Sequence, residues 1–219
     1  MTADLFVDQG FPTGMQRQEL APGAVILRQF AAAAGRELLA VLHTVAEEAA
    51  FRCMTTPGGR AMSVAMTNCG RYGWVTDAAG YRYTGADPVS GLSWPAMPEC
   101  VLALAAGAAA RAGFPGFSPD ACLINRYQPG ARLSLHRDSD EQDFRAPIVS
   151  VSLGVPAVFQ FGGARRADRP LRVRLEHGDV LVWGGPARLR YHGVMALKPA
   201  WHPLTGACRY NLTIRKAGP

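Results

Sequence analysis

Hydrophobic and polar positions follow different spacings in the two halves of the chain. In the first half, Ala24–Phe30 is an apolar run typical of a strand, whereas Ala31–Ala50 spaces its leucines along one face of an amphipathic helix. A second helix is predicted from about Pro95 to Ala112. Between the two, the Gly-, Tyr- and Trp-rich stretch Met62–Trp94 predicts hairpins. The first half therefore combines two helices with short hairpins.

From Asp120 onward, short β-type runs broken by glycine and proline replace the helical spacing. The runs are ACLINRY, ARLSLH, PIVSVSLG, AVFQFG, LRVRLE, DVLVWGG, RLRYHG and RYNLTIR. Many short strands without a helical pattern between them are typical of a sandwich or jelly roll. We therefore predict an α+β fold in which N-terminal helices pack on a double-stranded β-helix (jelly roll).

Composition narrows the class of protein without deciding its function. The chain is 48% hydrophobic and 18% charged, which excludes a disordered chain. No apolar run is long enough to span a membrane, and the first twenty residues lack the apolar centre of a signal peptide, so we expect a cytoplasmic protein that does not contact membranes. The cysteines form no C-x-x-C pair, so neither a disulfide framework nor a zinc ribbon is expected.

The basic residues give the chain a formal net charge of +6, and all but Lys198 and Lys216 are arginines. Arginine binds phosphate and carboxylate oxygens with two hydrogen bonds at once, which favours nucleic acid or an acidic small molecule as a partner. A GC-rich genome would produce the same preference for arginine over lysine. The charge therefore suggests a partner but does not identify one.

The strongest candidate for chemistry is the tripeptide His136-Arg137-Asp138. Alternate side chains of a strand share a face, so His136 and Asp138 are expected to point the same way. His192, near the end of another predicted strand, is the candidate for a third ligand. Two histidines and one carboxylate form the facial triad that holds non-haem Fe(II) and leaves positions open for a cosubstrate and O₂. An isolated H-x-D is common by chance, so this motif needs support from elsewhere.

A second candidate site lies on one face of the last predicted strand. Alternation places Arg209, Asn211 and Arg215 together, and Asn125 and Tyr127 share a face of an earlier strand in the same way. Such a polar face ordinarily meets solvent. Inside a barrel it would suit a dicarboxylate, because a buried arginine charge is costly unless an anion pairs with it.

A set of segments distributed from about Leu20 to Gly218 carries a further signal: TPGGRAMSVAMTNCGRYGW, WPAMP, PDACLINRYQPGARLSLHRDSDE, APIVSVSLG, FQFGG, LEHGDVLVWGG, RLRYHG and CRYNLTIRKAG. In these segments, and so over nearly its whole length, the chain resembles the AlkB family of bacterial DNA-repair dioxygenases. The resemblance implies dependence on Fe(II), with 2-oxoglutarate and O₂ as cosubstrates. The positions that match the family's iron ligands are His136, Asp138 and His192, and those that match its 2-oxoglutarate site are Asn125, Tyr127, Arg209, Asn211 and Arg215. Of these, Arg215 is expected at the distal carboxylate and Arg209 near the iron.

The resemblance implies oxidative dealkylation of DNA. In this reaction 2-oxoglutarate is decarboxylated to succinate and CO₂, a methyl group on a base nitrogen is hydroxylated, and the product loses formaldehyde. The implied substrates are 1-methyladenine and 3-methylcytosine, chiefly in single-stranded DNA and to some extent in RNA, and the base must leave its stack. The implied substrate contacts are Trp74 as a stacking platform, Tyr81, Tyr83, Asp140 as a charge partner for the cationic base, and Arg166.

Within one structural domain, we expect residues 1–22 to form an N-terminal arm. Residues 23–115 would then hold the helices and the nucleotide-recognition hairpins, and residues 116–219 the double-stranded β-helix catalytic core. A monomer is expected. Arg137 and Ser139 depart from the family's pattern, and these departures are expected to change how the chain contacts the phosphate backbone.

Three other functions are compatible with parts of the pattern. The first is a 2-oxoglutarate oxygenase that acts on RNA or protein, which the basic charge does not separate from one acting on DNA. The second is a non-catalytic cupin-like metal-binding barrel, which usually has H-x-H where this chain has H-x-D. The third is a nucleic-acid-binding module without catalysis, which would leave Arg209, Asn211 and Arg215 without a small anion to bind.

Overall fold

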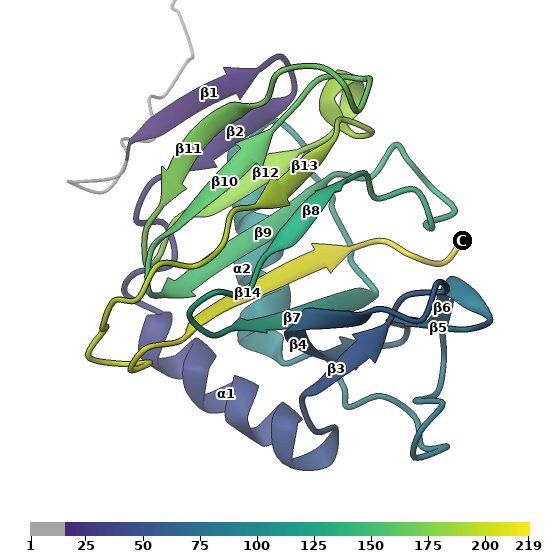
Figure 1. The fold of residues 1–219 in the computed structure, drawn as a ribbon. Coiled ribbons are helices and arrows are strands. Elements are labelled where there is room, and N and C mark those ends of the chain that lie inside the picture. Colours follow the sequence, from purple (N-terminus) through teal and green to yellow (C-terminus); the bar gives the residue numbers. More distant parts are fainter. Residues whose placement is uncertain (1–15) are drawn as a thin grey trace, which may run out of the picture.

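Three sheets and two long helices make up residues 16–219, the part of the chain that this computed structural model describes (Figure 1). In chain order the elements are β1 (Arg17–Ala21), β2 (Ala24–Leu27), α1 (Gly35–Glu48), β3 (Arg52–Thr55), β4 (Ala61–Gly70), β5 (Gly73–Asp77), β6 (Gly80–Thr84), α2 (Glu99–Arg111), β7 (Ala121–Tyr127), β8 (Leu133–His136), β9 (Ile148–Gly154), β10 (Ala157–Phe161), β11 (Leu171–Leu175), β12 (Val180–Trp183), a 3-10 turn (Gly185–Ala187), β13 (His192–Val194) and β14 (Arg209–Arg215).

The strands from β7 to β14 divide equally between two sheets. Four of them lie side by side as β12-β9-β14-β7 in the large sheet, and the other four form the small sheet β11-β10-β13-β8. The large sheet is extended at one edge by β2 and β1 and at the other by β4 and β3, while β5 and β6 form a separate hairpin (Figure 1). The predicted double-stranded β-helix is confirmed.

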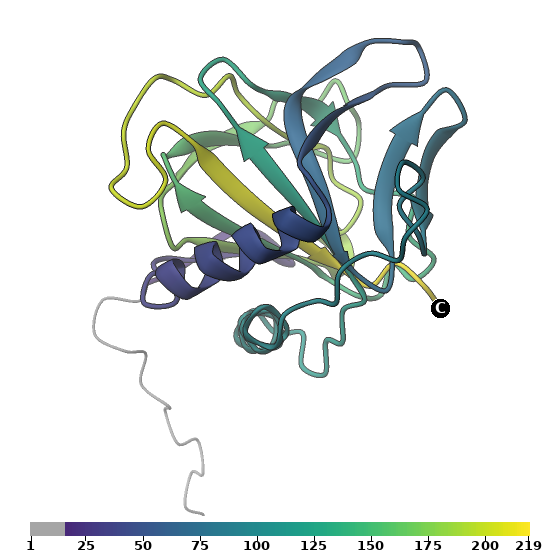
Figure 2. The same cartoon turned by 90° about the horizontal axis from the view of Figure 1, so that it is seen from below.

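Two hydrophobic cores lie on the two faces of the large sheet. One core fills the space between the sheets, where Ile26, Ile148, Phe159 and Trp183 pack together. The other lies under the helices, and Figure 2 shows α1 and α2 covering the same outer face of that sheet. Strand β9 is buried along its whole length because it lies between the small sheet and the helices. Val149, Val151 and Leu153 pack under the helices, whereas the buried serines Ser150 and Ser152 occupy the alternate positions.

Helix α1 buries the face predicted from its leucine spacing, with Leu38, Leu39, Leu42 and Val45 against the sheet. Helix α2 begins after Pro98, several residues later than predicted, because the prolines before it hold the chain extended. No helix in residues 16–219 is long and apolar enough to cross a membrane.

The last part of the N-terminal arm predicted for residues 1–22 forms a strand of the large sheet. Residues 17–21 form β1, which pairs with β2 from Arg17 opposite Leu27 to Ala21 opposite Ala24. The pairing arises because β2 already joins β12 along its other edge and offers a free edge to the preceding segment. The rest of the predicted arm lies mainly outside the described residues.

The β5–β6 hairpin is held firmly beside the open side of the barrel. Asn68 of β4 exchanges two hydrogen bonds of 3.0 Å with the backbone of Trp74 in β5. Trp94 packs directly on Gly73 and donates a 3.0 Å hydrogen bond to the carbonyl of Thr84. These contacts determine where the side chain of Trp74 lies.

Candidate active site

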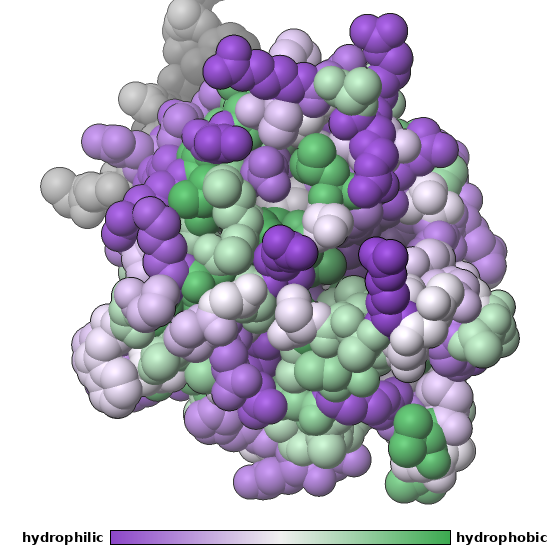
Figure 3. Space-filling model, viewed as in Figure 1, coloured by the Kyte–Doolittle hydropathy of each residue, from purple (hydrophilic) through white to green (hydrophobic). Residues whose placement is uncertain are grey.

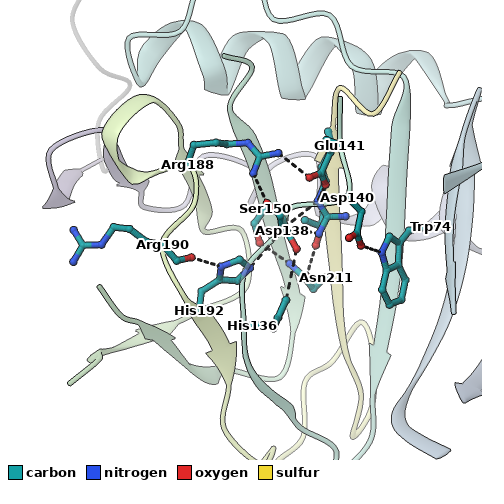
Figure 4. Close-up of polar contacts among 12 residues, drawn as sticks. Trp74, His136, Asp138, Asp140, Glu141, Ser150, Arg188, Arg190, His192 and Asn211 are labelled. Carbon is teal, nitrogen blue, oxygen red and sulfur yellow. Dashed lines mark hydrogen bonds and ion pairs between the residues drawn. The ribbon is translucent and has the colours of Figure 1, made fainter. Parts of the chain in front are cut away.

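His136 and His192 meet across two neighbouring strands of the small sheet. Strands β8 and β13 pair so that the two residues lie directly opposite, with ring centres 4.5 Å apart. Strand β8 ends at His136, so Asp138 lies beyond the strand and not within it as the alternation assumed. Its carboxylate nevertheless turns back, with Oδ1 3.7 Å from His136 Nε2 and Oδ2 3.6 Å from His192 Nε2 (Figure 4). The three predicted ligands therefore converge on one point.

Backbone carbonyls orient both imidazole rings. The Nδ1 atom of His136 lies 2.8 Å from the carbonyl of Ser134, and that of His192 lies 3.0 Å from the carbonyl of Arg190. A ring N–H that donates to such a carbonyl leaves Nε2 free to bind a metal, which is the usual arrangement behind a metal-ligating histidine. Burial, and then the neighbouring His136, lower the pKa of His192 to about 4, so this ring is neutral near pH 7.

Asp138 is held as an anion by Arg215, which donates from Nη2 and Nε to Oδ2 at 2.7 Å and 3.0 Å. Burial raises the pKa of Asp138, but the charge of Arg215 and then the two histidines outweigh it and hold that pKa well below its usual value. The ligand atoms of the triad all lie within 4.8 Å of one another. Two neutral imidazoles and one ionised carboxylate form the donor set that suits Fe(II).

A cavity of about 650 Å³ opens beside the triad, between the two sheets. One of its walls is formed by β7 and β14, whose register places Asn125 opposite Asn211 and Tyr127 opposite Arg209. The amide of Asn211 donates to Ser150 Oγ at 2.8 Å and to the carbonyl of Val151 at 3.0 Å (Figure 4). In the space-filling view of Figure 3, which has the same orientation as Figure 1, the surface of the molecule is recessed near the centre.

Two buried donors at the Tyr127 end of this wall form no hydrogen bond within residues 16–219. They are the hydroxyl of Tyr127, which lines the cavity, and Nε of Arg209, which pairs with Tyr127 across the two strands. Arg209 is 1% exposed, and its other nitrogens donate only to Ser152 Oγ at 2.9 Å and to the carbonyl of Tyr210 at 3.3 Å, with no carboxylate in ion-pair range among residues 16–219. Because an unpaired buried cation is costly, an anion bound here would stabilise the site. A carboxylate of 2-oxoglutarate fits this requirement.

The two arginines of β14 lie at opposite ends from those expected. Arg215 was predicted at the distal carboxylate of 2-oxoglutarate, but it contacts the metal ligand Asp138. Arg209 was predicted near the iron, but it lies six positions away along the strand, beside Tyr127. Alternation showed that the two share a face, but it did not show which end of β14 faces the triad.

On the outer side of the cavity, the indole of Trp74 is held between a carboxylate and an aromatic ring. Its Nε1 donates to Asp140 Oδ2 at 2.8 Å, and its ring stacks on Tyr81 with centroids 5.7 Å apart and planes inclined by 18°. Arg166 lines the same cavity. The site thus offers a flat aromatic surface and a negative charge side by side, which together suit a cationic aromatic group.

Tyr83 does not line the cavity, in contrast to the substrate contact expected of it. Its hydroxyl donates to Glu141 Oε1 at 2.7 Å, and burial raises the pKa of Tyr83 well above its usual value, so it keeps its proton. Glu141 also forms an ion pair of 3.1 Å with Arg188, which donates to the backbone carbonyl of Asp138 at 2.9 Å. The sequence analysis missed Glu141 and Arg188 because charged residues are rarely buried. The one available signal was their position in the sequence, close to Asp138 and His192 respectively.

Comparison with known proteins places this site in a family. The profile of the 2OG-Fe(II) oxygenase superfamily matches residues 23–215. The alpha-ketoglutarate-dependent dioxygenase AlkB of Escherichia coli (strain K12) is 58% identical over 215 residues, which cover 98% of each chain. The chain belongs to the AlkB family. Its AlkB-type site is therefore that of a non-haem iron dioxygenase, which uses Fe(II) with 2-oxoglutarate and O₂ as cosubstrates.

Two more distant AlkB relatives extend the comparison. The nucleic acid dioxygenase ALKBH1 of Mus musculus is 33% identical over 139 residues, which are 63% of this chain and 34% of that protein. The solved structure of OsALKBH1 has a TM-score of 0.81 and 29% identity, and the match covers 92% of this chain and 100% of that one. The fold of the AlkB family is thus shared over almost all of the described residues.

Proposed function

We propose that this enzyme repairs alkylated DNA by oxidative demethylation of 1-methyladenine and 3-methylcytosine. The observation that carries the proposal is that the metal triad, the Trp74 ring and the Asp140 carboxylate all open onto one cavity. Both methylated bases are flat cations, so they gain from stacking on Trp74, worth about 1–3 kcal/mol, and from a nearby negative charge. The base reaches this cavity only after leaving its stack.

In this proposal the chain binds and orients the reactants. His136, Asp138 and His192 hold Fe(II), which together with 2-oxoglutarate and O₂ supplies the oxidising chemistry for hydroxylation of an N-methyl group. The hydroxymethyl product then releases formaldehyde. Asn125 and Asn211 line the wall between the two ends of β14, while Arg215 fixes the orientation of Asp138.

At the far end of 2-oxoglutarate, we assign the distal carboxylate to Arg209 and the Tyr127 hydroxyl. Both are donors that lack a partner in the described structure, and both lie away from the triad. The assignment reverses the roles expected for Arg209 and Arg215 and explains why a buried guanidinium is tolerated at the start of β14.

The cavity mouth favours a nucleic-acid backbone as its partner. Arg60, Arg132, Arg137 and Arg166 all line the cavity and are exposed, and none forms an ion pair within residues 16–219. Arginines of this kind bind phosphates and displace counterions. We propose single-stranded DNA as the preferred substrate because an unpaired base costs less to extrude, and RNA as a weaker one. We also propose a cytoplasmic monomer, since one chain supplies every group of the site.

The proposal is tested with the purified protein, Fe(II), 2-oxoglutarate, O₂ and a short single-stranded DNA that carries one 1-methyladenine. Mass spectrometry follows loss of the methyl group beside formation of succinate and formaldehyde. We expect repair that requires all three additions, is abolished by His136→Ala and is retained by His43→Ala, which removes an exposed histidine of α1.

Matched RNA and double-stranded DNA oligonucleotides identify the polymer. Faster repair of the single-stranded DNA supports the assignment, whereas faster repair of RNA would contradict it. Succinate formation without repair of any oligonucleotide would contradict base demethylation and point to another target, such as a protein side chain.

A further inference from the structure

The β5–β6 hairpin contacts the iron site through two consecutive acidic residues. Trp74 and Tyr83 are direct cross-strand partners in this hairpin, so their side chains share a face. The indole of Trp74 donates to Asp140 at 2.8 Å, and the hydroxyl of Tyr83 donates to Glu141 at 2.7 Å. The segment that follows the iron ligand Asp138 is therefore bound by the hairpin at two adjacent positions (Figure 4 shows the first of them).

Glu141 is the buried centre of the second contact. Its side chain is 2% exposed, and besides Tyr83 it meets two arginines, with Arg188 Nη2 at 3.1 Å from Oε2 and Arg215 Nε at 3.3 Å from Oε1. Both arginines also bind Asp138, Arg188 at its backbone carbonyl and Arg215 at its carboxylate. Two buried carboxylates and two buried guanidinium groups thus neutralise one another in a single network.

Arg215 is shared between the two carboxylates. Its Nε lies 3.0 Å from Asp138 Oδ2 and 3.3 Å from Glu141 Oε1, the same oxygen that accepts the Tyr83 hydroxyl. A hydrogen bond from Tyr83 draws off part of the charge on that oxygen and weakens its hold on Arg215. Without the hydroxyl, Glu141 would attract Arg215 more strongly and draw it away from Asp138.

We propose that Tyr83 and Glu141 are positioning residues that couple the base-stacking hairpin to the iron ligand Asp138. Through this connection, the position of the hairpin sets how firmly Arg215 holds the Asp138 carboxylate, and hence how that carboxylate faces the metal. The coupling rests on the proposed function, in which a base stacks on Trp74. It gives Tyr83 a role other than the direct substrate contact expected from the sequence.

The inference is tested with Tyr83→Phe and Glu141→Gln, which remove one hydroxyl and one charge with little change of shape. Tyr72→Phe and Asp87→Asn serve as controls: the first removes a hydroxyl outside the network, and the second removes a buried carboxylate that pairs with Arg52 at 2.6 Å. The first readout is the visible charge-transfer absorption of the Fe(II)–2-oxoglutarate complex, recorded without O₂ and without DNA. We expect a displaced absorption maximum in the two network variants and none in the controls.

The second readout is the amount of succinate formed per base repaired. Both network variants should raise this ratio by about twofold or more, and the double variant should resemble Glu141→Gln alone, because contacting residues act non-additively. If the Glu141→Gln variant does not fold, the Tyr83→Phe variant alone decides the outcome, because it keeps the aromatic ring and loses only the hydroxyl group.

An unchanged absorption maximum and an unchanged ratio in Tyr83→Phe would overturn the coupling and leave Tyr83 a purely structural residue. The absorption measurement needs no DNA. Failure of the wild-type protein to repair any base would therefore contradict the proposed function while the absorption still decides the connection from Tyr83 to the metal.

Discussion

Replacing Arg209 by methionine separates the effect of its buried charge on the stability of the protein from its effect on the affinity for 2-oxoglutarate. Without 2-oxoglutarate the guanidinium has no anionic partner in the described structure. An apolar side chain of similar volume therefore relieves an unpaired charge, which in comparable sites is neutral or stabilising. The lost hydrogen bonds to Ser152 and Tyr210, worth about 0.5–1.5 kcal/mol each, oppose that gain. We expect the melting temperature of the protein without 2-oxoglutarate to change little.

With 2-oxoglutarate bound, the same substitution removes one partner of a buried charge pair. Such a truncation costs about 2–5 kcal/mol. Since about 1.4 kcal/mol corresponds to tenfold in affinity, the Kd for 2-oxoglutarate should rise by roughly 30-fold to several thousandfold. The substitution should therefore lower the affinity for 2-oxoglutarate strongly, although it leaves the fold intact.

Calorimetric titration with Mn(II) in place of Fe(II) measures this Kd without turnover, and melting curves report stability in the same samples. At 100 times its Kd, a ligand stabilises the wild-type protein by about 2.7 kcal/mol, or roughly 5–10 °C for a domain of this size. Arg209→Met should lose most of this increase. Arg28→Met is the matched control, because Arg28 pairs with the buried Asp179 at 2.6 Å and its loss should lower stability but not affinity. Unchanged affinity in Arg209→Met would refute the reasoning.

Three further predictions follow from single contacts. Trp74→Ala should raise the KM for methylated DNA by about 5- to 150-fold, the equivalent of one stacked base, and steady-state kinetics that show an unchanged KM would contradict the platform. Gly193→Ala places a Cβ 2.8 Å from the carbonyl of Leu133, which should push β13 from β8 and weaken Mn(II) binding by about 10- to 100-fold, whereas Gly58→Ala meets open space and should leave calorimetric binding unchanged. Burial, and then His202, lower the pKa of His177, so the unfolded chain binds more protons below about pH 6.5 and stability falls on acidification. The substitution His177→Asn keeps an acceptor for the Gly154 amide but removes the titrating ring. Between about pH 7.5 and 5.5, the melting temperature of this variant should fall less than that of the wild type. An equal fall in both proteins would contradict the claim that His177 causes the loss of stability in acid.

The strands and helices were largely predictable because each follows a simple period. Strands β7 to β12 and β14 lie within the predicted runs, and α1 buries the leucines that the helical spacing placed together. Strand β13 contains only the last two residues of the run RLRYHG. Alternation along the last strand also placed Arg209, Asn211 and Arg215 on one face, and the pairing of β14 with β7 adds Asn125 and Tyr127 to that wall.

What could not be predicted depends on contacts between distant segments. Which of Arg209 and Arg215 lies nearer the iron site depends on where Asp138, in the segment after β8, meets β14. The alternation of side chains along a single strand carries no information on that contact. The inward position of Tyr83 depends on a buried carboxylate at Glu141, and sequence patterns give little warning of buried charge. Strand β1 forms because an edge of β2 is free, which is a property of the assembled sheet.

The most direct test of the account is the stoichiometry of a single reaction. A single-stranded oligonucleotide with one 1-methyladenine, incubated with the protein, Fe(II), 2-oxoglutarate and O₂, should lose the mass of one CH₂ group. One formaldehyde and at least one succinate should appear for each base restored, and His136→Ala should produce none of these. Succinate formed with the methylated base left intact would contradict the central claim that this AlkB-family enzyme demethylates DNA.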